Sequence, residues 1–202
     1  MQFEPALEIV GRLKRRFGEP LTVTDLCRET PLSYQPVYEY VRRLSDAGAL
    51  AVRKQGARLL CEPAATPAGS LWLAQWSVRE LAGEEATWLG ELAAATEGRM
   101  RDRSLPPTAI VALDPGSEQG AELRSTAALP EGLASRAAGR TLSAAQFAEW
   151  LRGREGRWEV ARRVIPLAGH QALWALALAA REATRGPAPP APTGRRRSIF
   201  GD

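Results

Sequence analysis

The chain has 202 residues, of which 45% are hydrophobic and 25% charged, with a formal net charge of +4 and a mean hydropathy of −0.25. This composition is enough to bury the core of one domain or of two small ones. It excludes a membrane-spanning chain, because no apolar run approaches the roughly 20 residues that a helix needs to cross a bilayer. The first residues are not a secretory signal, so we expect a cytoplasmic protein.

The two cysteines, Cys27 and Cys61, have neither a CxxC spacing nor a histidine neighbour. A metal site or a disulfide is therefore a poor interpretation, and both are expected to be small buried residues. We expect no cofactor.

Residues 3–17 have the spacing of an amphipathic helix. Its apolar stripe consists of Ala6, Ile9, Val10, Leu13 and Phe17. Thr22 then precedes a short helix as its N-cap, with Asp25 in the first turn, and this helix ends near Glu29.

A second helix of the same motif follows Ser33 and ends at Gly48, which supplies a left-handed exit. It carries Val37, Val41 and Leu44 at helical spacing. Beyond it, residues 51–54 and 57–60 flank Gln55-Gly56, which predicts a β-hairpin with basic residues around its tip.

Together these elements resemble the winged helix-turn-helix domain of bacterial transcriptional regulators, the IclR and MarR types among them. The resemblance lies in the order of helix, capped short helix, L-S-x-x-x-V-Y-x-x-V-x-x-L helix, A-G-x-L and hairpin. It implies double-stranded DNA as partner, read by the second helix of the motif and flanked by the wing. A plain three-helix bundle with a hairpin is the alternative.

The candidate DNA-binding residues are those left outward when the apolar stripe of the second helix faces the core. Gln35 is suited to adenine and Glu39 to cytosine, while the cations suit phosphates. The full set is Tyr34, Gln35, Tyr38, Glu39, Arg42, Arg53, Lys54 and Arg58. Residues 1–62 carry ten basic and eight acidic side chains, a net charge of only +2, so a protein-docking adaptor in chromosome or replication processes is a second hypothesis.

Residues 63–69 read as a linker rich in Pro, Ala and Gly. A helix is predicted next, over residues 70–98, and Gly83 can divide it. This helix contains Trp72, Trp76 and Trp88. So much aromatic area on one segment predicts a packed core or a homodimer interface.

The rest of the chain reads as strands at 108–113 and 121–128, a helix capped by Ser143, a strand alternating from Trp158 to Val164, and a last segment, 173–179, that is ambiguous between helix and strand. We interpret that last segment as a strand. The closing pattern I-P-L-x-G-x-Q-A-L-W-A-L-A-L-A then resembles the hairpin of a small GAF-type sensory domain, which implies dimerisation or ligand sensing.

An enzyme is the lesser alternative. Residues 110–117, IVALDPGS, are similar to the first-strand motif of Holliday-junction resolvases with an RNase H-like fold, which would make Asp114 a Mg²⁺ ligand. Other carboxylates lie at no recognisable spacing, and His170 has no nucleophile partner and reads as an exposed turn residue. We therefore assign no catalytic residue and no metal.

The C-terminal segment, residues 184–202, is rich in Pro and Arg and predicts a disordered tail. Its end could dock a partner through Arg195, Arg196, Arg197, Ile199 and Phe200.

The predicted fold class is thus α+β, with a winged helix-turn-helix at 1–62, a linker at 63–69, a GAF-like α+β domain at 70–183 and a tail at 184–202. The predicted function is that of a DNA-binding transcriptional regulator.

Overall fold

The computed structural model describes residues 3–82, 87–106, 108–117, 120–130, 133, 138–153 and 156–185. The chain is a mixed α+β protein with two small sheets, as the sequence predicted. None of the helices in these ranges combines the length and apolar character that a membrane span requires.

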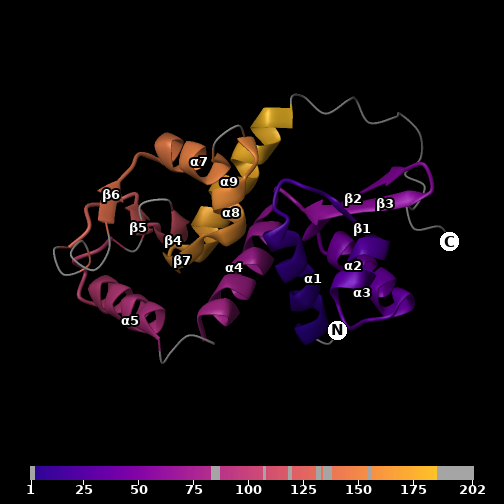
Figure 1. Ribbon diagram of the computed structural model, residues 1–202, viewed down its shortest axis with the longest axis horizontal. Helices are drawn as coiled ribbons and strands as arrows, with labels where there is room; N and C mark the ends of the chain where they lie inside the picture. Colours follow the sequence, from indigo (N-terminus) through magenta and orange to yellow (C-terminus); the bar gives the residue numbers. More distant parts are fainter. Residues whose placement is uncertain are drawn as a thin grey trace.

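The N-terminal part holds three helices and a three-stranded antiparallel sheet of order β1-β3-β2 (Figure 1). The predicted helices and the hairpin are all present. Their bounds are α1 (Phe3–Arg15), β1 (Leu21–Thr22), α2 (Val23–Glu29), α3 (Tyr34–Asp46), β2 (Leu50–Gln55) and β3 (Arg58–Pro63).

Local chemistry explains where these elements begin and end. Thr22 and Asp25 form a capping box: the Thr22 hydroxyl accepts from the Asp25 N–H at 3.1 Å, and the Asp25 carboxylate accepts from the Thr22 N–H at 3.0 Å. Gly48, with φ +71°, ends α3, and Gly56, with φ +60°, forms the hairpin turn. Glycine adopts this left-handed conformation without steric cost, which confirms both predicted turns.

The C-terminal part holds a four-stranded sheet of order β6-β5-β4-β7. Strand β4 is antiparallel to β5 and β7, and β5 is parallel to β6. The elements are α4 (Pro67–Ala82), α5 (Trp88–Arg101), β4 (Val111–Ser117), β5 (Gly120–Ser125), β6 (Ala138–Thr141), α7 (Ala144–Arg152), α8 (Glu159–Arg163), β7 (Ile165–Ala168) and α9 (His170–Arg185).

Two predicted strands are helices. Residues 159–163 form α8, and residues 173–179, which we predicted as a returning strand, lie within α9. The apolar residues of α9 fall at helical spacing, because Leu173, Trp174, Ala177 and Leu178 are buried while Ala175 is exposed. Alanine and leucine also have high helix propensity. The hairpin on which the GAF resemblance depended therefore closes with a helix.

The segment between β3 and α4 is packed against the end of α3. The Thr66 hydroxyl donates to the Gly48 carbonyl at 2.6 Å and accepts from the Gly69 N–H at 3.0 Å. A side chain at Gly69 would clash with the carbonyl of Ala64. Helix α4 thus begins at Pro67, within the predicted linker, and extends only to Ala82.

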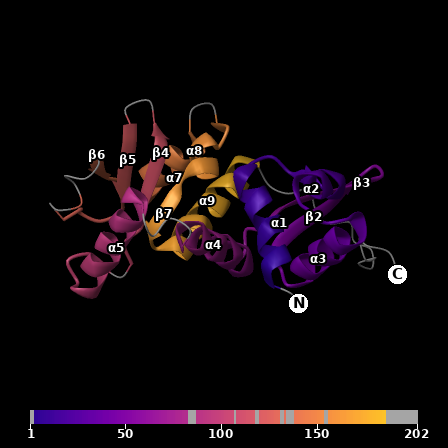
Figure 2. The ribbon, with the colours of Figure 1, turned by 60° about the horizontal axis from the view of Figure 1, so that its bottom comes forward.

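One hydrophobic core contains residues from both sides of this segment. Phe17, which follows α1, meets Trp158 and Trp174 with ring centroids 5.4 and 5.7 Å apart. Helices α4, α8 and α9 lie between the N-terminal elements and the four-stranded sheet (Figure 2). A second core fills the space between that sheet and α5 and includes Leu92, Leu105, Val111 and Leu123.

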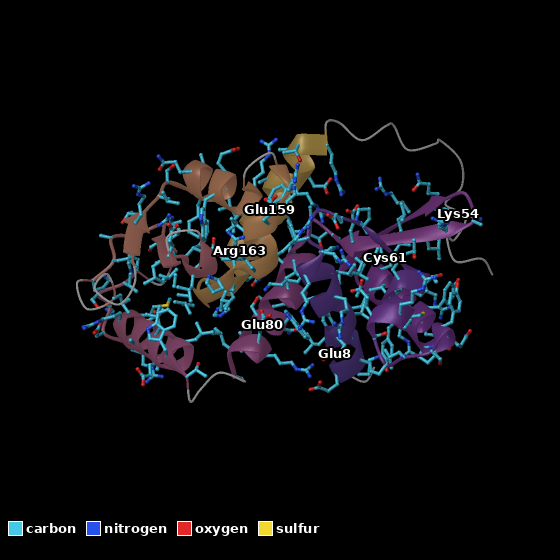
Figure 3. All side chains as sticks on the ribbon, in the orientation of Figure 1. Glu8, Lys54, Cys61, Glu80, Glu159 and Arg163 are labelled. Atoms are coloured by element: carbon cyan, nitrogen blue, oxygen red, sulfur yellow. The ribbon has the colours of Figure 1, made fainter. Side chains whose placement is uncertain are left out.

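Polar contacts also join the two parts. Buried Lys14 of α1 donates to Glu80 of α4 at 3.0 Å, and Figure 3 shows Glu80 beside α1. Arg162 of α8 donates to the Phe17 carbonyl at 3.0 Å and to Glu19 at 2.8 Å. The N-terminal helices and the hairpin are therefore held on a framework made by the rest of the chain.

Candidate nucleic-acid interface

Helix α3 has one buried and one exposed side. Val37, Val41 and Leu44 are fully buried, whereas Tyr34 is 55% exposed. The outward residues predicted from the sequence lie on the exposed side, except that Tyr38 is only partly exposed. The exposed members are Tyr34, Gln35, Glu39 and Arg42.

Contacts between neighbouring side chains of α3 restrict the conformations of this exposed side. The rings of Tyr34 and Tyr38 are stacked, with centroids 6.2 Å apart and planes inclined by 19°. One turn of helix also joins Gln35 to Glu39, because the Gln35 amide donates to the Glu39 carboxylate at 3.3 Å. Gln35 and Glu39, the two residues predicted to recognise bases, therefore hold each other's side chains in place.

The predicted wing cations do not share one face of the hairpin. Lys54 pairs with Leu59 and Arg53 with Leu60, and side chains alternate between faces along a strand. Lys54 and Leu59 lie on the face that borders α2 and α3. Arg53 lies on the other face, where its charge helps to lower the pKa of Glu62. Arg58, which pairs with Gln55, starts from the same face as Arg53, but it still lines the pocket near the hairpin turn. Figure 3 shows Lys54 near the far end of the hairpin.

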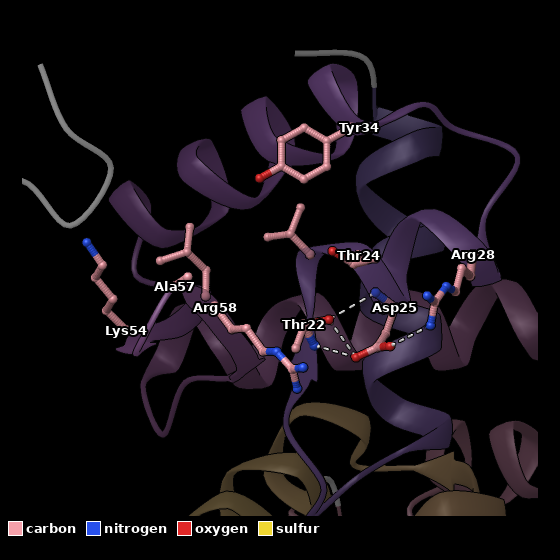
Figure 4. A pocket seen from close by; sticks show the side chains of 10 residues that line it. Thr22, Thr24, Asp25, Arg28, Tyr34, Lys54, Ala57 and Arg58 are labelled. Atoms are coloured by element: carbon pink, nitrogen blue, oxygen red, sulfur yellow. Dashed lines mark hydrogen bonds and ion pairs between the residues drawn. The ribbon is translucent and has the colours of Figure 1, made fainter.

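A pocket of about 430 Å³ lies between α2, the start of α3 and the hairpin. Figure 4 shows Tyr34 on one side of it, the hairpin side chains on another, and the first turn of α2 opposite. The lining residues are Thr22, Val23, Thr24, Asp25, Arg28, Tyr34, Lys54, Ala57, Arg58 and Leu59.

The pocket carries more positive than negative charge. Arg28, Lys54 and Arg58 line it against the single carboxylate of Asp25. Hydrogen bonds from the Thr22 hydroxyl, at 2.6 Å, and from the Thr22 N–H hold the pKa of Asp25 below its usual value, and the charges of Arg28 and Arg58 add to this effect. Asp25 is therefore ionised at neutral pH, and the pocket has a net charge of +2.

Four of the eight acidic side chains of the N-terminal part pair with arginines of the C-terminal part. Arg79 of α4 pairs with Glu4 and Glu8 at 2.7 and 3.2 Å. Glu19 and Glu62 pair with Arg162 and Arg185. Asp25 and Glu29 pair instead with Arg28 and Arg16 within the N-terminal part. By contrast, no described residue forms an ion pair with Arg42, Lys54 or Arg58. The surface of α3 and the hairpin is thus more basic than the formal charge of +2 for residues 1–62 suggests.

The sequence did not identify Thr24 and Arg28 as part of this surface. The capping motif at Thr22 located the start of α2 correctly, but sequence spacing does not reveal which element lies opposite that turn. Only the tertiary arrangement of α2 and the hairpin brings Arg28, Tyr34 and Arg58 around one pocket.

The nuclease candidate has a different environment. Asp114 is buried in β4 and accepts two hydrogen bonds from the Arg163 guanidinium, at 2.6 and 2.8 Å. Its cross-strand neighbour Glu122 pairs with Arg124. Within the described ranges, no three His, Cys, Asp or Glu side chains gather as a metal site would require.

The remaining candidates are distributed differently from the prediction. Trp76 is buried and Trp72 half-buried on α4, whereas Trp88 begins α5 and is 45% exposed, so the three do not share one helix. His170 is not an exposed turn residue: it is half-buried at the start of α9, and burial lowers its pKa. Cys61 is buried and Cys27 partly buried, and both are free thiols.

The first two residues of the predicted tail, Thr184 and Arg185, are helical. They are the last residues of α9, and Arg185 binds Glu62 of β3. The docking residues Arg195, Arg196, Arg197, Ile199 and Phe200 lie outside the described residues.

Comparison with protein-family models, curated proteins and solved structures finds no match to this chain. Its function is therefore inferred from the α3 and hairpin surface itself.

Proposed function

We propose that residues 3–63 form a winged helix-turn-helix that binds double-stranded DNA, with α3 entering the major groove and the hairpin β2–β3 acting as the wing. The observation that carries this proposal is the pocket shared by Tyr34 of α3 and by Lys54 and Arg58 of the hairpin. Helix and wing border one surface in this arrangement, so that a duplex lying across that surface can receive α3 in its major groove and contact the hairpin beside it.

The chemistry of α3 fits base recognition flanked by phosphate contacts. The Gln35 amide and the Glu39 carboxylate present a donor and acceptors toward base edges, and their mutual hydrogen bond limits the conformations available to both. Arg42, two turns along the exposed side, and the hairpin cations neutralise backbone phosphates. In this proposal the chain is a DNA-binding transcriptional regulator whose C-terminal part supports the winged helix-turn-helix.

A second candidate is a protein-docking adaptor that uses the same face. It is favoured by Glu39 on the reading face and by the exposed ring of Tyr34, which an apolar or basic protein surface could cover. The two candidates differ in salt dependence. DNA binding releases counterions from several phosphates and weakens steeply with salt.

The test is a fluorescence-anisotropy titration of labelled duplex DNA with the full chain over a series of salt concentrations. The parent should show a steep log–log slope, and Arg42→Ala should weaken binding and reduce the slope by about one. Arg101→Ala is the matched control, because Arg101 is 75% exposed on α5 and pairs only with its helix neighbour Glu97 among the described residues. If Arg42→Ala and Arg101→Ala bind alike, α3 does not contact DNA, and the adaptor is the better interpretation.

A further inference from the structure

The stacked tyrosines of α3 present an aromatic face to the pocket. Tyr34 packs against Tyr38 on one side and is 55% exposed, and its ring lines the pocket opposite the first turn of α2 (Figure 4). An aromatic ring exposed to water lacks the stabilisation that burial usually gives to aromatic residues. A planar ligand placed against Tyr34 would extend the existing stack.

Base pairs in an intact duplex do not offer their faces to a protein. They present only edges in the grooves, so a tyrosine on a recognition helix can touch a base edge but cannot stack on it. An unpaired base exposes its whole face, and stacking of such bases on aromatic side chains is the usual mode of single-strand recognition.

The remainder of the pocket suits the sugar and phosphates of the same nucleotide. Lys54 and Arg58 approach from the hairpin and Arg28 from α2, so cations lie on two sides of Tyr34. The volume of about 430 Å³ falls within the range of about 300–1,000 Å³ that small-ligand sites occupy. One nucleotide therefore fits between the helices and the hairpin.

We propose that this pocket holds an unpaired nucleotide of a DNA strand, with its base stacked on Tyr34 and its flanking phosphates bound by Arg28, Lys54 and Arg58. The inference rests on the proposed DNA-binding function and specifies its substrate. The preferred DNA is a duplex that carries an unpaired or extruded base next to the segment contacted by α3.

The test compares two labelled DNAs. One is an intact short duplex, and the other is the same duplex with one extra unpaired nucleotide whose base is a fluorescent adenine analogue. The full chain should bind the second DNA about tenfold more tightly, because stacking on an aromatic side chain contributes that order of affinity. Stacking on Tyr34 should also quench the analogue. Tyr34→Phe should retain the preference and the quenching, and Tyr34→Ala should lose both.

The control is Arg42→Ala, which lies outside the pocket and should weaken binding to both DNAs equally while preserving the preference. Equal affinity of the parent for the two DNAs, or a preference that survives Tyr34→Ala, would overturn this inference and leave the proposed function standing. Binding to neither DNA would overturn both. A free deoxynucleotide should not displace the DNA at matching concentration, and displacement would show a small-molecule site instead.

Discussion

Arg185, in the last turn of α9, donates a hydrogen bond of 2.7 Å to Glu62 at the end of β3, across a separation of 123 positions in the chain. A second contact joins the other nitrogen and oxygen of the pair. Arg181, one turn earlier and only 2% exposed, donates to the Pro63 carbonyl at 2.6 Å and lies 3.7 Å from Glu62. The base of the hairpin is thus fastened to the C-terminal helix by a buried carboxylate and two guanidinium groups.

Replacing Glu62 with Gln should destabilise the protein strongly. The side chain of Glu62 is 7% exposed, and its loss would leave Arg181 without its principal counter-charge in the core. Removing one partner of a buried ion pair costs about 3 kcal/mol in the free energy of unfolding. The control is Glu182→Gln, since Glu182 contacts the same two arginines but is 47% exposed and should cost less than about 1 kcal/mol. Denaturant unfolding of both variants measures the difference, and equal losses would refute a buried role for Glu62.

The contribution of Glu62 should depend on pH. Burial alone would raise the pKa of Glu62, but the hydrogen bond from Arg185 and the charges of Arg181 and Arg185 hold it below the ordinary value of 4.5. A carboxylate whose pKa is lower in the folded state stabilises the fold above its unfolded pKa, and this stabilisation is lost as the pH falls through the folded pKa. The difference in melting temperature between the parent and Glu62→Gln should be constant above pH 4.5 and shrink at more acidic pH. A difference that grows with acidification contradicts this assignment.

The part of the fold set by local chemistry could be predicted from the sequence. The N-cap at Thr22, the turns at Gly48 and Gly56 and the Ser143 cap depend on residues close together in the chain, and each is found where it was predicted. Residues 158–164 and 173–179 were misassigned because alternation and helical spacing coincide over short apolar segments. Burial against Phe17 and α4 decides in favour of helix there, and such contacts are invisible in the local pattern.

The candidate site was predictable only in part for the same reason. The exposed side of α3 follows from its own periodicity, so Gln35, Glu39 and Arg42 could be named. The contribution of Arg28, the orientation of Arg53 away from Lys54 and the position of Tyr34 beside the pocket depend on strand register and on the placement of α2. The homodimer stays a prediction, and its original reason is weakened because Trp76 packs within the chain against Gly11.

Asp114 should act as a structural anion that joins β4 to α8. Arg163→Ala would leave its buried carboxylate without the bidentate partner and should cost about 3 kcal/mol, whereas Arg163→Lys should recover part of the loss through a single contact. Adding Mg²⁺ should leave the melting temperature of the parent unchanged, because both Asp114 carboxylate oxygens already accept hydrogen bonds from the Arg163 guanidinium. Stabilisation by Mg²⁺ together with cleavage of branched DNA would instead support the nuclease alternative.

Gly11 should be essential to the packing of α1 on α4. A Cβ at this position would lie 2.5 Å from the Trp76 ring, which also has the Arg15 and Arg79 guanidinium groups within 5.6 and 5.5 Å of its centroid. Gly11→Ala should therefore lower the free energy of unfolding by about 1–3 kcal/mol despite the better helix propensity of alanine. Gly98→Ala on α5, where a Cβ meets no atom within 4 Å, should stabilise by up to about 1 kcal/mol. Thermal melts that shift in the same direction for both variants would contradict the predicted clash.

The three hairpin cations should contribute unequally to DNA binding. Lys54 and Arg58 line the pocket beside Tyr34, whereas Arg53 does not line it and its charge acts on Glu62. Lys54→Ala and Arg58→Ala should each weaken binding and reduce the salt slope by about one. Arg53→Ala should leave the slope unchanged and should cost less than about 1 kcal/mol of stability, since Arg53 is exposed. Anisotropy titrations and melting curves on the same three variants separate these effects. An equal loss of affinity in all three would mean that DNA contacts both sides of the hairpin and that the pocket has no special role.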